Sequence, residues 1–135
     1  MKTFQIILRD TARHERIDEV VSFVGEDASG SFGILPGHAR IITALVFGLA
    51  RFRTSNGPWE YLAMPGAMLY FTGNTLHIDT RRYLRSDDYE NISQDLVDIL
   101  AVEEQDLLEM KSNLRRIEEN IMRRLLEMES EGITP

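Results

Sequence analysis

Cysteine is absent from this chain of 135 residues. Disulfides, thiolate metal ligands and cysteine nucleophiles are therefore excluded. Basic residues are also few, because 15 Lys and Arg stand against 22 Asp and Glu and give a formal net charge of −7. This balance argues against nucleic acid as the main partner, since phosphate binding needs a basic surface.

Long hydrophobic runs are missing as well. No stretch reaches the roughly 20 apolar residues that a transmembrane helix needs. The N-terminus, "MKTFQIILRDTARHERIDEV", lacks the apolar length and the cleavage site of a secretory signal. We therefore expect a soluble protein made in the cytoplasm that associates with a membrane at most peripherally.

Glycine and proline do not occur between Gly73 and Gly132. Apolar residues there recur at spacings of three, four and seven, which predicts an amphipathic helix with Ser93 as a candidate N-cap. Five of them repeat every seven residues, as in a coiled-coil seam: Leu100, Leu107, Leu114, Ile121 and Met128. The pattern allows one long helix or a helical hairpin that turns at residues 110–113.

The residues up to about Tyr83 follow a different pattern, with short apolar runs separated by turn residues. "TFQIILR" places Phe4, Ile6 and Leu8 on one face, and Gly73-Asn74 between two runs predicts a hairpin. We therefore predict an α+β protein. A flattened antiparallel β-sandwich or barrel at residues 1–86 precedes a helical domain at 87–135.

The sequence contains no catalytic constellation that we can identify. Its histidines, His14, His38 and His77, form no HxH or HxxxH pair, and the glycine-rich "GEDASGSFGILPG" lacks the ending of a phosphate-binding loop. We expect no catalytic residue, no metal and no cofactor.

The segment "GSFGILPGHARIITAL" resembles the epsilon subunit of F-type ATP synthases. Matching positions are Gly30, Gly33, Ile34, Leu35, Pro36, Gly37, His38, Ala39, Thr43 and Leu45, whereas Arg40 replaces the usual proline. A second stretch agrees at Tyr61, Gly66, Gly73, Asn74 and Asp79, and departs at Arg81. The resemblance covers roughly residues 4–90, and the order of β domain and helical tail extends it to the whole chain.

This resemblance implies a ten-stranded β-sandwich and a non-catalytic subunit of the central rotor stalk, at the cytoplasmic face of the membrane. Such a subunit couples the catalytic head to ion transport by gripping the gamma subunit and touching the ring of c subunits. The implied interface residues are Ser31, Phe32, Gly33, Ile34, Leu35 and His38. An acidic residue common in the family at the position of Ser31 is missing.

The tail departs further from the family. The motif through which some members bind ATP is incomplete, because Asp95 and Asp98 are present but no arginine follows until Arg115. The tail looks like that of the epsilon subunit from the alternate, sodium-type operons. We expect it to be an interaction element for the alpha and beta subunits of the catalytic head, with a regulatory role open, through Leu107, Leu114, Arg115, Arg116, Ile121, Arg123 and Arg124.

Two alternatives are also compatible with the sequence. A self-associating adaptor would pair through the heptad seam of the tail. A small cupin-like metal protein would use His38, Glu60 and His77, although the spacing lacks the HxH pair that cupins need. The coupling ion, proton or sodium, is set by other subunits.

Overall fold

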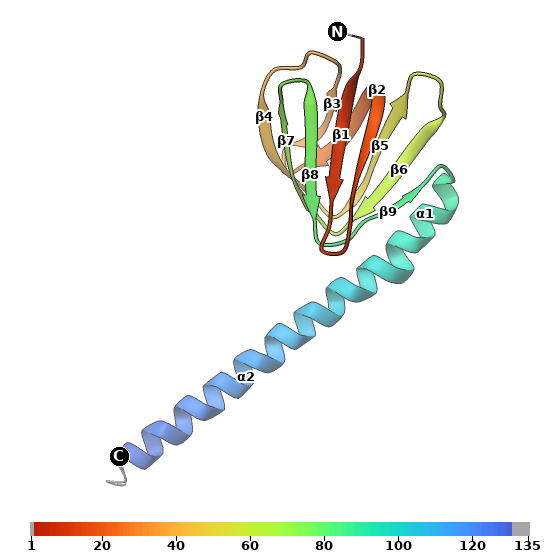
Figure 1. Ribbon diagram of the computed structural model, residues 1–135. Coiled ribbons are helices and arrows are strands. Elements are labelled where there is room, and N and C mark those ends of the chain that lie inside the picture. Colours follow the sequence, from red (N-terminus) through yellow and green to blue (C-terminus); the bar gives the residue numbers. More distant parts are fainter. Residues whose placement is uncertain (1, 131–135) are drawn as a thin grey trace. The chain divides into compact units, whose positions relative to one another are not determined.

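The computed structural model describes residues 2–130 (Figure 1). Its contacts group into two compact units, residues 1–101 and 102–135, and the tail residues 131–135 lie outside the described part. The strands are β1 Phe4–Arg9, β2 His14–Asp27, β3 Gly30–Ile34, β4 Ile41–Leu45, β5 Gly48–Thr54, β6 Trp59–Met64, β7 Ala67–Thr72, β8 Thr75–Thr80 and β9 Leu84–Ser86.

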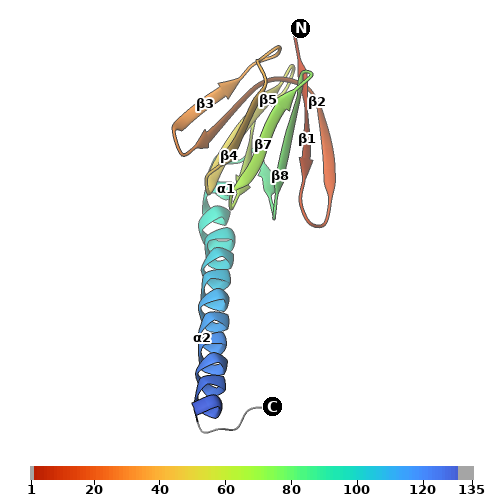
Figure 2. The same ribbon diagram turned by 90° about the vertical axis from the view of Figure 1, so that its left-hand side faces the viewer.

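The strands pair in the order β1-β8-β7-β4-β2-β5-β6-β9, and β2 also pairs with β1 and β3. All pairings are antiparallel except β1 with β8. The long strand β2 therefore pairs with strands on both sides of the core that the strands enclose (Figure 2). The predicted β-sandwich is confirmed.

The described residues form nine strands instead of the ten implied by the resemblance. One reason is the length of β2, which runs for 14 residues. It contains an irregularity at which a strand could have ended, but the strand continues through it. Glu19 adopts a left-handed φ of 56° there, and the pairing register with β5 shifts between Val20 and Ser22. A bulge of this kind bends a strand without ending it.

Alternation of apolar and polar residues produces the core. Phe4, Ile6 and Leu8 are buried on one face of β1, as predicted, and every second residue of most other strands joins them. The fully buried side chains include Phe23, Phe52, Phe71, Ile34, Leu62, Leu69, Leu76 and Ile78. Burial of this apolar surface is the main source of the sandwich's stability.

The tail is one helix, so the helical hairpin is the wrong alternative. Helical residues continue without a break through α1 Tyr89–Asp95, the π-helical η1 Leu96–Ala101 and α2 Val102–Ser130. Ser112 and Asn113 lie inside α2 because no glycine or proline is present to end the helix there. None of the helices within residues 2–130 combines the length and apolarity needed to cross a bilayer.

The helix begins at a different cap from the one expected. Asp88, not Ser93, is the N-cap, and its side chain accepts a hydrogen bond of 3.1 Å from the Asn91 backbone N–H. Ser93 lies within α1. The earlier start lets the first helical turn contact the sandwich.

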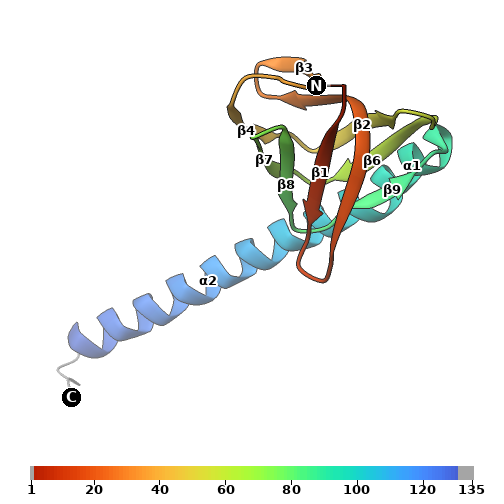
Figure 3. The same cartoon turned by 45° about the horizontal axis from the view of Figure 1, so that its top comes forward.

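The segment α1 lies against β6 and β9 (Figure 3), and η1 contacts β6. Ile92 and Leu100 are buried with Ala63 in a second apolar cluster. Half-buried Leu49, Tyr61, Leu84 and Leu96 surround that cluster. By contrast, α2 contains no buried residue.

Candidate interaction site

The turn after β3 is the first part of the candidate site. β3 ends at Ile34, and the His38 backbone N–H donates a hydrogen bond of 3.1 Å to the Leu35 carbonyl across Pro36-Gly37. Gly37 has a φ of 79°, a left-handed conformation that glycine adopts without steric cost. His38 therefore lies directly after a tight turn at the edge of the sandwich.

Asn74 holds this turn in place from the β7–β8 hairpin. Its Oδ1 accepts a hydrogen bond of 2.9 Å from the Gly37 N–H, and its Nδ2 donates one of 2.7 Å to the Thr3 carbonyl. Gly73 and Asn74 have φ values of 56° and 58°, as in a type I′ turn. The sequence indicated the hairpin but not this second role, although an asparagine in a turn is a signal for side-chain hydrogen bonds to the backbone.

Asp27 fixes the hairpin that carries Ser31. Its carboxylate accepts hydrogen bonds from the Ser29 N–H at 2.9 Å and from the Thr43 hydroxyl at 2.7 Å. Hydrogen bonding from the Ser29 side chain, followed by that from Thr43, holds the pKa of Asp27 below its ordinary value. The β2–β3 turn is thus tied to β4.

The six predicted interface residues differ in exposure. Leu35 is 61% exposed, and Ser31, Gly33 and His38 are also exposed. Phe32 is half-buried with its ring centroid 6.5 Å from that of Phe23. Ile34 is fully buried, so it supports the turn from inside and offers no surface.

Exposed apolar side chains are also present on β4 and β7. Ile42 and Met68 are 70% and 53% exposed. On the paired strands Ile42 lies opposite Tyr70, and Met68 lies opposite Ala44. We call these four residues the β4–β7 face. Ile42, Ala44 and Met68 are exposed, whereas Tyr70 is half-buried. Neighbouring exposed apolar side chains are typical of a protein–protein contact surface.

The residues considered for a metal site are not brought together. His38 lies near Phe71, with ring centroids 6.0 Å apart, whereas His77 stacks on Tyr70 at 4.3 Å. Tyr70 and Phe71 are consecutive in β7 and so point to opposite sides of the sheet. Glu60 forms an ion pair of 2.9 Å with Arg85. Within residues 2–130 no group of three potential metal ligands is present.

His77 belongs to a polar cluster on the outer side of β1, β7 and β8. Arg9 lies 3.3 Å from its Nδ1 and forms an ion pair of 2.7 Å with Asp79. Burial, followed by the charge of Arg9, lowers the pKa of His77, and Asp79 opposes this. The cluster is internally paired, which indicates a structural role.

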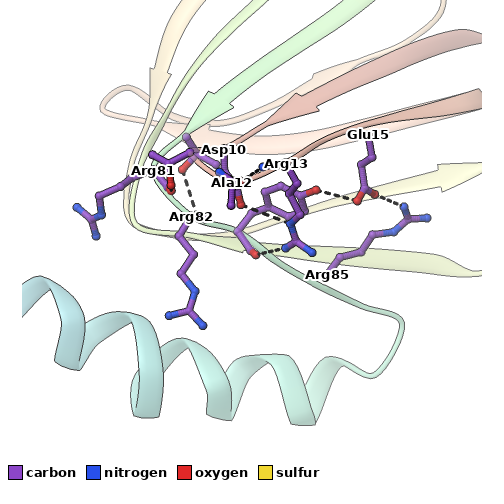
Figure 4. Close-up of polar contacts among 10 residues, drawn as sticks. Asp10, Ala12, Arg13, Glu15, Arg81, Arg82 and Arg85 are labelled. Carbon is purple, nitrogen blue, oxygen red and sulfur yellow. Dashed lines mark hydrogen bonds and ion pairs between the residues drawn. The ribbon is translucent and has the colours of Figure 1, made fainter.

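A second network joins the β1–β2 and β8–β9 connections (Figure 4). The buried Tyr83 donates a hydrogen bond of 2.7 Å to Glu15, whose other oxygen pairs with Arg85. Burial, followed by that hydrogen bond, raises the pKa of Tyr83 to about 12. Burial also acts to raise the pKa of Glu15, but the bonds from Tyr83 and Arg85 outweigh it and lower that pKa.

Arg13 completes this network. Its guanidinium lies 4.1 Å from the Tyr83 ring centroid and donates a hydrogen bond of 2.8 Å to the Tyr83 carbonyl. Asp10 in turn accepts bonds from the Ala12 and Arg13 backbone N–H groups at 2.9 and 2.8 Å (Figure 4). Satisfied in this way, the network fixes the chain just before the helix.

The predicted tail residues all lie on α2. Leu107 is half-buried, and the other six are exposed: Leu114, Arg115, Arg116, Ile121, Arg123 and Arg124. Within α2 the Arg116 guanidinium donates a hydrogen bond to the Asn113 side chain. The helix thus presents arginines and apolar side chains together.

Known proteins share both sequence and fold with this chain. It is 46% identical over 57 residues to the ATP synthase epsilon chain 2 of Cereibacter sphaeroides, a match that covers 42% of this chain and 39% of that protein. It is 28% identical over 117 residues to the chloroplastic ATP synthase epsilon chain of Nicotiana tabacum, covering 87% and 86%. The Cereibacter match thus spans only about two fifths of that relative's length.

Two solved structures have the same fold. One is the OSCP/F1/c-ring structure of the Euglena gracilis mitochondrial ATP synthase, with a TM-score of 0.59, 16% identity, and coverage of 75% of this chain and 66% of that chain. The other is the central stalk/c-ring structure of the Tetrahymena thermophila enzyme, with a TM-score of 0.53, 16% identity, and coverage of 62% and 66%.

Residues 3–86 also match the model of a protein family described as the ATP synthase delta/epsilon chain, β-sandwich domain. The match covers well over half of the chain and ends where β9 ends. The protein therefore belongs to the ATP synthase delta/epsilon chain family.

Proposed function

We propose that this protein is the epsilon-type subunit in the central rotor stalk of an F-type ATP synthase. It has no catalytic role of its own and couples the catalytic head to ion transport through the membrane sector. It acts at the cytoplasmic face of the membrane as part of the complex. Family membership supports this proposal, and the relative named epsilon chain 2 fits a variant from an alternate operon.

The observation that best supports this proposal is the turn after β3, which is exposed and held in place by hydrogen bonds. Leu35 is 61% exposed, while Asn74 fixes Gly37 two residues away. A preorganised apolar side chain loses little entropy when it binds a partner. The proposed contacts with the gamma subunit and the c-ring are Ser31, Phe32, Gly33, Leu35 and His38, and Ile34 supports them from the core.

The β4–β7 face extends the proposed gamma contact. Ile42 at 70% and Met68 at 53% exposure would bury apolar area on association, which is the main favourable term in most protein–protein interfaces. In this proposal residues 1–86 bind gamma and the c-ring. Residues 87–135 then carry the tail that contacts the alpha and beta subunits through its seven predicted residues.

The test is gel filtration of the full chain mixed with the matching gamma subunit, alongside a chain ending at Ala101. The truncation keeps buried Leu100 and removes α2. We expect a stoichiometric complex with both chains. No complex with either chain would refute the proposal, whereas self-association that disappears on truncation would favour the adaptor.

A matched pair of variants localises the contact. Leu35→Glu places a charge on the proposed interface, and Val97→Glu places one at a side chain of nearly equal exposure on η1, 61% against 59%. We expect Leu35→Glu to weaken the gamma complex by about tenfold or more, the loss of about 1.4 kcal/mol. Val97→Glu should leave it unchanged, and equal weakening by both would reject the assigned surface.

A further inference from the structure

Two arginines and a tryptophan form a patch on the outer face of β5 and β6. Arg51 and Arg53 project from the same face of β5, and Trp59 lies opposite Arg53 on β6. The two guanidinium carbons lie 4.6 and 5.3 Å from the Trp59 ring centroid. We call Arg51, Arg53 and Trp59 the Arg–Trp patch.

The arginines of this patch are exposed and have no carboxylate partner within residues 2–130. Arg85, which lies over the neighbouring Phe52 ring, is in contrast paired with both Glu15 and Glu60. Stacking on an aromatic ring restrains a guanidinium but leaves its N–H groups free to donate to a carboxylate. The patch therefore places two cations without a carboxylate partner side by side in a protein of net charge −7.

A groove of about 420 Å³ adjoins the patch. Arg51 is one of its walls, and Tyr61, directly opposite Arg51 on β6, is another. Tyr61 meets Tyr89 edge to face, with centroids 5.3 Å apart. The other residues that line the groove are Val24, Gly25, Glu26, Ser31, Leu49 and Ala50. Tryptophan, tyrosine and arginine are the residues that contribute most to protein–protein affinity.

We propose that the Arg–Trp patch and this groove bind an extended, acidic segment of a partner polypeptide. Side chains two residues apart on a strand are separated by about 6.8 Å. Carboxylates at alternate positions of an extended segment therefore match Arg51 and Arg53, and an apolar side chain two residues further along, on the same face of the segment, packs on Tyr61 and Tyr89. Glu26 also lines the groove and repels a carboxylate there, which favours an apolar side chain of the segment at that position.

A polypeptide fits this site better than a membrane surface does, because a bilayer could reach the arginines but would leave the groove empty. The proposal goes beyond the stalk function, and Ser31 is the one residue of the groove that is also assigned to the contact with gamma and the c-ring. The partner is defined only by its chemistry: carboxylates at alternate positions of an extended segment, with an apolar residue two positions further along.

Trp59 is the only tryptophan in the chain, so its fluorescence reports directly on the patch. We would titrate the full chain with the blocked peptide Ser-Asp-Ser-Asp-Ser-Leu-Ser, in which both Asp residues and the Leu share one face of an extended strand. A peptide of the same composition with its two Asp residues adjacent tests the spacing, and one with both Asp residues replaced by Asn tests the charge. Vesicles of phosphatidylglycerol test the membrane alternative.

We expect a saturable fluorescence change with the alternating acidic peptide and weaker binding of the other two peptides. The double variant Arg51→Gln/Arg53→Gln should bind about tenfold more weakly or worse, the effect of losing a charged hydrogen bond. Arg16→Gln/Arg40→Gln removes the same charge from exposed positions outside the patch and should bind normally. Circular dichroism confirms that both double variants are folded.

Three results would overturn the proposal. The acidic peptide could give no saturable change. The Arg16/Arg40 variant could lose as much affinity as the Arg51/Arg53 variant, which would reduce the effect to net charge. Vesicles could change the Trp59 fluorescence in a way that depends on Arg51 and Arg53, while the peptides leave it unchanged. That result would make the patch a lipid-binding surface.

Discussion

Single side chains determine how firmly the candidate interface is held. Asn74 adopts a left-handed φ of 58° and uses both ends of its amide, one to the Gly37 N–H and one to the Thr3 carbonyl. Tyr83 plays a similar part at the network beside the helix, where its hydroxyl donates to Glu15. In both cases a polar side chain links segments that are distant in the sequence.

Replacement of Asn74 by Gly separates its backbone role from its side-chain role. Glycine keeps the left-handed conformation but loses both hydrogen bonds, so we expect the free energy of unfolding to fall by about 1–3 kcal/mol. Urea denaturation measures this fall, and hydrogen exchange should show faster exchange at Gly37. Asn56→Gly in an exposed turn is the control, and an equal loss there would contradict the assigned role.

Replacement of Tyr83 by Phe removes the hydroxyl that donates to Glu15 and should cost about 1–2 kcal/mol at neutral pH. The pKa of Tyr83 is raised from 10.0 to about 12 in the folded protein, so folding favours its protonated form. That contribution is complete below about pH 10 and is lost as the pH rises towards 12. The difference in unfolding free energy between wild type and variant should therefore narrow over this range, measured by urea denaturation. A constant difference would mean that the hydroxyl titrates normally.

Apolar residues at equivalent positions along the helix differ in burial. The heptad seam places Leu100 and Leu114 in equivalent positions, yet Leu100 is fully buried against the sandwich and Leu114 is 57% exposed. Repetition of apolar residues therefore serves two purposes along one helix. In η1 it fixes the helix to β6, and in α2 it leaves a surface for partners.

The substitution Leu100→Ala should destabilise the protein by about 2–5 kcal/mol, because it empties a buried site next to Ile92 and Ala63. Leu114→Ala should change the free energy of unfolding by less than about 0.5 kcal/mol, as expected for an exposed position. Chemical denaturation of the two variants compares them directly. Similar losses would show that α2 contributes to folding stability.

At the scale of the whole molecule, the two compact units are expected to have separate tasks. The sandwich unit, residues 1–101, contains both apolar clusters, whereas α2 contains no buried residue. Stability should therefore come from the first unit and partner contacts from both.

A chain truncated after Ala101 should keep the urea midpoint of the full chain, with an unfolding free energy within about 0.5 kcal/mol. The physical reason is that the described part of α2 contains no fully buried residue. Circular dichroism should show the loss of helix, while the fluorescence of Trp59 follows unfolding of the sandwich. A large drop in the midpoint would show that the tail supports the sandwich.

Sequence patterns alone determined a great deal of this protein. Period-two alternation identified the face of Phe4, Ile6 and Leu8, the glycine-free stretch with its 3–4 spacing identified the helix, and the segment around Pro36-Gly37-His38 indicated the family. These features are local, because each depends on residues that are near one another in the chain. Local patterns do not determine the number of strands, because a bulge such as the one at Glu19 bends a strand without ending it.

Contacts between distant residues were decided only by the tertiary structure. Pairing of β7 with β8 and the position of β1 bring Asn74 to both Gly37 and Thr3, and no spacing in the sequence encodes that meeting. The pairing of β5 with β6 likewise places Trp59 beside Arg51 and Arg53. Leu100 is buried and Leu114 is exposed, although both occupy the same position of the heptad repeat. A periodic pattern specifies which residues share a face, but only packing specifies what that face meets.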